Sequence, residues 1–95
     1  MALNAKRCWI IAYDISDPKR LGRVYRMMLK RGIPQQRSVF QATMNTIQAR
    51  RLKDELAALI DHRADDVRIY PLPDTPEIIR LGRGGSNIPA YTLVE

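Results

Sequence analysis

The sequence predicts a small α+β domain built from alternating strands and helices. Its length of 95 residues suits one domain and leaves no room for two. Hydrophobic residues make up 45% of the chain, enough for one modest core. Apolar residues recur with a strand-like period in some segments and a helix-like period in others. We therefore treat residues 1–95 as a single domain.

The first strand is expected over residues 8–13, a continuous apolar run that ends at Asp14. Because both alternating sides of this run are apolar, the strand should be buried on both faces. A helix should follow, with Asp17 as its N-cap and Pro18 at its first position. Gly32 is expected to end it. Its apolar stripe consists of Leu21, Val24, Tyr25, Met28 and Leu29.

The second half of the chain continues the alternation. Residues 36–44 predict one strand, or two short strands that meet at a tight turn. Asn45 and Gln48 form a capping pair for a second helix that should end near His62. Further strands are expected around Val67 and Ile69, over residues 77–81, and at the C-terminus over residues 91–94.

This order is that of the ferredoxin-like βαββαβ fold, here with an extra C-terminal strand. Such a sheet carries helices on one face only. Because the first strand is apolar on both sides, something else must cover the helix-free face. We expect a homodimer packed through its sheet faces. The alternative is that the C-terminal segment folds back over its own sheet.

The charge is strongly basic and unevenly spread. The formal net charge is +6, and residues 1–53 hold 12 Lys/Arg against 2 Asp/Glu. Such a balance favours a polyanionic partner, DNA or RNA, over the alternative of general solubility. One cysteine, Cys8, and one histidine cannot form a disulfide or a zinc site. We expect a cytoplasmic protein without a membrane segment or signal peptide.

Asp14 is the candidate catalytic and metal-ligating residue. It stands at the end of a buried strand, where a carboxylate can take part in a Mg²⁺ site. A two-fold dimer would place a second copy of it nearby. The alternative is ordinary turn chemistry. Asp17 is explained by helix capping and is only a secondary metal candidate.

The face of the first helix opposite its apolar stripe is the candidate nucleic-acid surface. It carries Lys19, Arg20, Arg23, Arg26 and Lys30. A solvated face usually mixes charge signs, yet no acid occurs between Pro18 and Gln36. Phosphate contact is therefore favoured over a merely solvated face. Arg37 would extend this surface, and Phe40 could stack on a base or pack in the core.

Four segments together resemble one family. They are Tyr13-Asp14-Ile15-Ser16-Asp17, the basic first helix, Gln36-x-Ser38-Val39-Phe40 and Arg68-Ile69-Tyr70-Pro71-Leu72. In order and spacing they are similar to the CRISPR-associated adaptation protein two family, endoribonucleases and small subunits of the spacer-acquisition complex. The resemblance implies a homodimer whose final strand, within residues 82–95, crosses to the partner subunit.

The resemblance also implies a Mg²⁺ site between the Asp14 carboxylates of two subunits. Activity in this family has been linked to positions that match Arg20 or Arg23, and Phe40. One departure is Pro34, which stands where members often carry a basic residue. Only Arg31 and Arg37 supply a basic side chain nearby.

The sequence therefore predicts a CRISPR adaptation subunit with Mg²⁺-dependent endonuclease activity on single-stranded RNA or double-stranded DNA. One alternative is a non-catalytic DNA-binding scaffold that bridges dimers of an integrase subunit. Another is a toxin-type endoribonuclease of the virulence-associated D family. The last is a dimer that binds small molecules or proteins.

Overall fold

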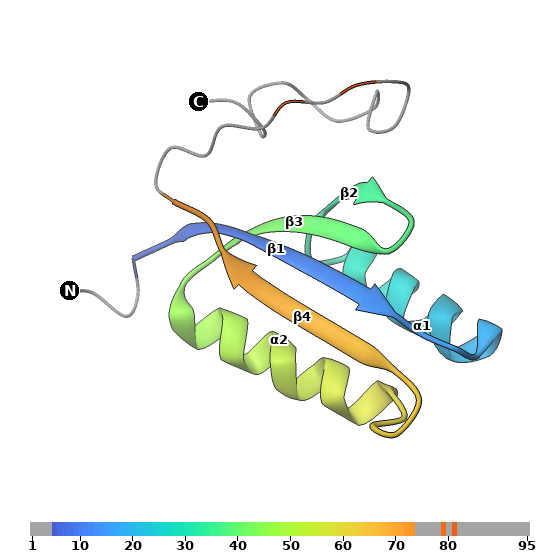
Figure 1. The fold of residues 1–95 in the computed structure, drawn as a ribbon. Helices are drawn as coiled ribbons and strands as arrows, with labels where there is room; N and C mark the ends of the chain where they lie inside the picture. Colours follow the sequence, from blue (N-terminus) through green and yellow to red (C-terminus); the bar gives the residue numbers. More distant parts are fainter. Residues whose placement is uncertain (1–4, 74–78, 80, 82–95) are drawn as a thin grey trace.

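The computed structural model describes residues 5–73, 79 and 81, and the elements below lie within this part. They are β1 (Arg7–Asp14), α1 (Pro18–Leu29), β2 (Ile33–Gln36), β3 (Val39–Met44), α2 (Thr46–Leu59) and β4 (Asp66–Pro71). The strands form one sheet in the order β2-β3-β1-β4, and every neighbouring pair is antiparallel (Figure 1). The expected α+β class is confirmed.

The core lies between the sheet and the two helices. Alternate residues of β1, among them Ile11 and Tyr13, are buried together with residues of both helices. Register places Phe40 of β3 opposite Ile11, on the same side. Both helices therefore cover one face of the sheet. The largest fully buried side chains are Phe40, Ile11, Met28, Leu52, Leu56 and Val24.

Both helices begin with the caps that the sequence predicts. The carboxylate of Asp17 accepts a hydrogen bond from the Arg20 backbone N–H at 2.9 Å. Asn45 and Gln48 form a complete capping box, in which each side chain accepts the other residue's backbone N–H. Beyond α1, a Cβ on Gly32 would lie 2.6 Å from the carbonyl oxygen of Gln41. Only glycine lets the chain pass β3 so closely.

The structure resolves one open alternative and moves two boundaries. Residues 36–44 contain the end of one strand and the whole of the next, and the first of these, β2, begins at Ile33. Pro34 is tolerated inside β2 because this edge strand pairs only with β3. The second helix ends at Leu59, before the expected His62. The strands expected over 77–81 and 91–94, and the extension 82–95, lie outside the continuous described range.

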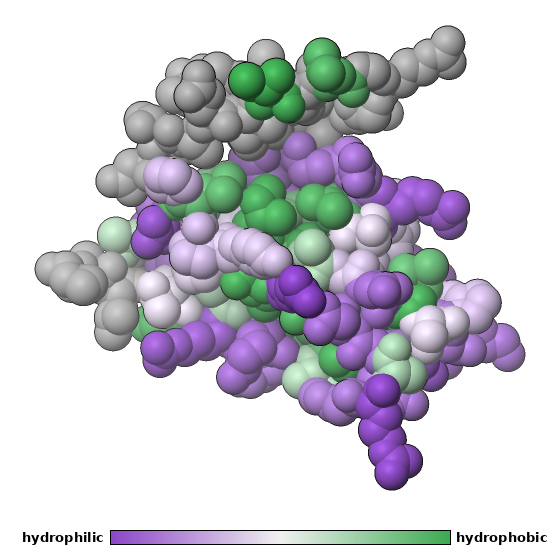
Figure 2. Space-filling model, viewed as in Figure 1, coloured by the Kyte–Doolittle hydropathy of each residue, from purple (hydrophilic) through white to green (hydrophobic). Residues whose placement is uncertain are grey.

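The helix-free face of the sheet combines apolar side chains with polar ones, among them Thr43 opposite Cys8 and Arg68 opposite Ala12. Register aligns Ile33, Gln41, Ile10 and Tyr70 in one row across all four strands. Cys8, Ala12 and Val39 flank this row. Figure 2 shows a band of hydrophobic side chains over the β2 and β3 side of the sheet, with pale and hydrophilic ones over β4. Among the described residues, no helix is long and apolar enough to span a membrane.

Candidate nucleic-acid site at the end of the sheet

Asp14 is the last residue of β1, and its side chain is exposed. Its register partner on β4 is Asp66, so two carboxylates stand side by side at this end of the sheet. Asp66 also accepts a bond from Nε of Arg68, at 2.9 Å. Within the part of the chain that the structure describes, no three His, Cys, Asp or Glu side chains gather as a metal site. Asp14 and Asp66 are thus a pair of carboxylates at this end of the sheet, without a third such ligand beside them in the described part of the chain.

A second carboxylate, Asp65, organises the loop that follows Asp14. Its side chain has no exposed surface. It accepts five hydrogen bonds: from the backbone N–H and hydroxyl of Ser16, from Nε and Nη2 of Arg20, and from the Asp61 backbone N–H. These bonds join the β1–α1 loop to the connection between α2 and β4.

The electrostatics of Asp65 follow from these bonds. The Arg20 guanidinium, and then the backbone donors of Asp61 and Ser16, hold the pKa of the Asp65 carboxyl well below its usual range. The same pairing raises the pKa of Arg20. Asp65 is therefore ionised at neutral pH, and Arg20 is its counter-ion.

Arg20 thus differs from the other basic residues of α1. We expected it to contact nucleic acid, but its Nε lies 2.8 Å from Oδ2 of Asp65 and its side chain is only 23% exposed. Its main contact is inside the protein. Sequence reasoning did not identify Asp65, because its partners lie up to 49 residues away along the chain. No local pattern reports such a contact.

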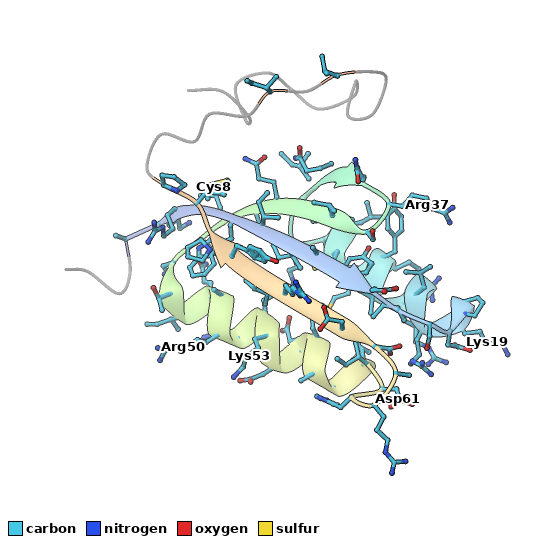
Figure 3. All side chains as sticks on the ribbon, viewed as in Figure 1. Cys8, Lys19, Arg37, Arg50, Lys53 and Asp61 are labelled. Atoms are coloured by element: carbon cyan, nitrogen blue, oxygen red, sulfur yellow. The ribbon has the colours of Figure 1, made fainter. Side chains whose placement is uncertain are left out.

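Four of the expected contact residues lie at the surface of the protein. Lys19, Arg23, Arg26 and Arg37 are all exposed, and none has an ion-pair partner among the described residues. Figure 3 shows Lys19 and Arg37 at the end of the molecule where β1 ends. Two further basic residues, Arg50 and Lys53, lie along α2, away from that end. Lys19 of α1 and Arg37 therefore lie at the end of the sheet where β1 ends in Asp14.

The β2–β3 turn is fastened to β1 beside Asp14. Tyr13 donates its hydroxyl to the carbonyl oxygen of Arg37 at 2.9 Å, and its backbone N–H to the carbonyl of Ser38 at 3.0 Å. Burial, and secondarily the nearby Tyr25, raises the pKa of Tyr13 to about 12, so this hydroxyl stays a donor at neutral pH. Arg37 is thereby held at the rim of a cavity that Asp14 also lines.

Phe40 is a correction to the expected contact residues. Its side chain has 0% exposed surface and lies between Tyr13 and Tyr25. It packs edge-on against Tyr25, with ring centroids 5.6 Å apart. In this structure Phe40 has no surface with which to stack on a base. Its place on the helix-covered face of β3 explains why it is buried.

The fold and the site together define a small α+β protein with a carboxylate at the end of an inner strand and a basic helix beside it. Comparison with known proteins identifies the family. Residues 7–77 match the model of the CRISPR associated protein Cas2 family. The chain belongs to that family, as the sequence motifs indicated.

Relatives and solved structures agree with this assignment. The chain is 47% identical over 75 residues to CRISPR-associated endoribonuclease Cas2 1 of Nitrosomonas europaea, covering 79% of this chain and 71% of the relative. It is 45% identical over 76 residues to CRISPR-associated endoribonuclease Cas2 2 of Thermodesulfovibrio yellowstonii, covering 80% and 84%. The crystal structure of a hypothetical protein, TT1823, from Thermus thermophilus superposes with a TM-score of 0.78 at 30% identity, covering 84% and 95%.

Proposed function

We propose that this chain is a metal-dependent endonuclease subunit of a CRISPR adaptation system, acting as a ferredoxin-like homodimer. One observation carries the proposal. The exposed carboxylate of Asp14 ends an inner strand at the same end of the sheet as Lys19 and Arg37, and hydrogen bonds of Ser16 and Arg20 to Asp65 hold the loop that follows it. The names of the relatives, which are endoribonucleases, support the same reaction class.

Each residue of the site has a distinct task in this proposal. Asp14, with the Asp14 of a second subunit, would hold Mg²⁺ through carboxylate oxygens, the ligands this ion prefers. When bound, the ion supplies charge that stabilises the transition state of phosphodiester hydrolysis and lowers the pKa of a water. Arg23 and Arg37 would bind the phosphates on either side. Asp65 and Arg20 would hold the Asp14 loop in place.

The homodimer is proposed to pack through the helix-free face of the sheet. Ile10 and Ile33, which lie in the row shared by all four strands, support this arrangement because packing against a second sheet would remove their side chains from water. The extension 82–95 would cross to the partner subunit. Two Asp14 residues, one from each subunit, would then complete a ligand set that one chain lacks.

A non-catalytic role is the second candidate. In it, the chain binds the backbone of DNA and bridges dimers of an integrase subunit. The exposed basic face of α1 favours this role as well, because phosphate binding by Lys19, Arg23 and Arg26 does not need Asp14. Pro34 also favours the non-catalytic role, because members of the family often carry a basic residue at that position.

The test is cleavage of labelled single-stranded RNA and double-stranded DNA, with Mg²⁺ or with EDTA, by the wild-type protein and by Asp14→Asn. We expect cleavage that needs the metal and is lost in Asp14→Asn, while binding is retained. Arg63→Ala, an exposed change on the α2–β4 turn, serves as the control and should cleave normally. Wild-type cleavage no higher than that of Asp14→Asn, with intact duplex binding, would instead establish the scaffold role.

A further inference from the structure

A cavity of about 570 Å³ opens directly beside Asp14. Residues of the first turns of α1 and of the β2–β3 turn line it. Asp14 and Arg37 are both among its lining residues, so the cavity is shared by the proposed metal ligand and an exposed guanidinium. A phosphate bound at this rim would carry its own sugar and base toward the interior of the cavity.

The wall of the cavity suits a flat, partly polar group. Tyr25 contributes a half-buried aromatic ring, which packs edge-on against the ring of Phe40. No described residue is seen to hydrogen-bond the Tyr25 hydroxyl, which leaves it available to a ligand. Leu21 and Pro18 add aliphatic surface. A nucleobase matches this set, because it has a π-face for stacking and polar edges for hydrogen bonds.

Gly22 keeps one side of the cavity open. It lies inside α1, where glycine weakens a helix relative to alanine. Packing does not demand glycine here. Apart from the adjacent residues and the backbone of its own helix, a Cβ at this position would meet only the tip of the Arg26 side chain, at 3.3 Å. The absence of a side chain therefore has one evident effect on the structure, which is to leave the cavity wall bare.

We propose that this cavity binds one unpaired nucleobase next to a phosphate held by Arg37. The inference rests on the proposed function and deepens it, since it names the substrate element that the site would select. A base that stacks inside a duplex cannot enter. The site would therefore act on single strands, or on duplexes that open at that position.

The test uses short single-stranded RNAs with 2-aminopurine at one position at a time, in EDTA so that no strand is cut. Fluorescence reports the environment of the modified base, and anisotropy reports binding separately. We expect a fluorescence change confined to one or two positions of the bound strand. Gly22→Met should abolish that change and weaken binding about tenfold, the size of one lost stacking contact.

Two controls separate the cavity from its surroundings. Ala58→Met adds the same side chain to an exposed position of α2 and should leave both signals as in the wild type. An RNA lacking the base at the responsive position should bind the wild type about tenfold more weakly, but should bind Gly22→Met no more weakly than the intact strand does.

The outcomes distinguish this inference from the nuclease proposal. A position-specific signal that Gly22→Met removes supports the base site, even if the protein cleaves nothing with Mg²⁺. An RNA that binds without any fluorescence change, or with a change that Gly22→Met leaves intact, overturns the base site, even if Asp14-dependent cleavage is found. Failure to bind any single strand overturns it as well.

Discussion

Arg20 and Asp65 bind each other through two hydrogen bonds, from Nε to Oδ2 at 2.8 Å and from Nη2 to Oδ1 at 3.1 Å. The pair joins the first turn of α1 to the residue before β4, across 45 positions of the chain. Nη2 of Arg20 also donates to the Ser16 hydroxyl at 3.2 Å, and Ser16 itself donates twice to Asp65. The loop after Asp14 is therefore hydrogen-bonded both to α1, through Arg20, and to the residue before β4, Asp65.

Substitutions that break this pair should disturb the site more than substitutions of the exposed residues beside it. Arg20→Lys cannot reproduce the two-point contact, and Asp65→Asn leaves the partly buried guanidinium without its counter-ion. We expect each change to lower the melting temperature and the cleavage rate. The double variant should lose less than the two single losses combined, because both changes break one interaction. Full additivity in the double-mutant cycle would contradict this coupling.

The same pair predicts how stability depends on acid. The pKa of Asp65 is lowered in the folded protein, so its contribution is fully present above the unfolded value near 3.8 and is lost as pH falls below it. Melting temperatures from pH 7 down to pH 2 should therefore fall less steeply below about pH 4 in Asp65→Asn than in the wild type. Parallel curves for the two proteins would show that Asp65 does not titrate as described.

Salt dependence should separate the residues that contact phosphate from those that position the site. Removing one phosphate contact lowers the slope of log K against log salt by about 1. We expect this reduction for Arg23→Ala and for Arg26→Ala, measured with duplex DNA between about 50 and 200 mM salt. Arg20→Ala should leave the slope unchanged. A full-unit drop for Arg20→Ala would place that side chain on the nucleic acid.

Tyr13→Phe tests the link between β1 and the β2–β3 turn. It removes the hydrogen bond to the Arg37 carbonyl and should cost about 1 kcal/mol of unfolding free energy at neutral pH. Because the pKa of Tyr13 is raised to about 12, its contribution is complete below pH 10 and is lost as pH rises toward 12. The difference between the two proteins should therefore shrink above pH 10. A constant difference would contradict this assignment.

A charge in the middle of the helix-free face should prevent dimer formation. Ile10 lies in the row shared by all four strands, so Ile10→Glu would place a carboxylate inside the proposed interface. Light scattering should find a monomer with a wild-type circular dichroism spectrum. Ile47→Glu, at a 49% exposed position of α2, should remain a dimer. A dimer in both variants would contradict packing through the sheet faces.

The parts of this fold that follow from local patterns were predictable from sequence. Asp17 and the pair Asn45 and Gln48 cap their helices as expected, because capping depends on residues three positions apart. The strand β2 was less clear, since Pro34 weakens a strand pattern unless the strand is known to lie at an edge.

Two features of the site depend on contacts that the sequence does not display. Asp65 acquires its role from Ser16 and Arg20, which only the folded chain brings to it. For Phe40 the sequence left open whether it stacks on a base or packs in the core, and its place on the helix-covered face of β3, against Tyr25, decides for the core. In contrast, the exposure of Arg23 could be predicted from the period of its helix, and that of Asp14 from its place at the end of the apolar run.

The number of metal ions per dimer tests the central claim most directly, since it asks whether two Asp14 carboxylates form one site. Mn²⁺ can replace Mg²⁺ as an oxygen-bound ion and is counted by electron paramagnetic resonance. Titration of the wild-type dimer should give one tightly bound Mn²⁺ for every two chains, and none in Asp14→Asn. One ion per chain, or the same binding in Asp14→Asn, would contradict a metal site shared between the two Asp14 residues.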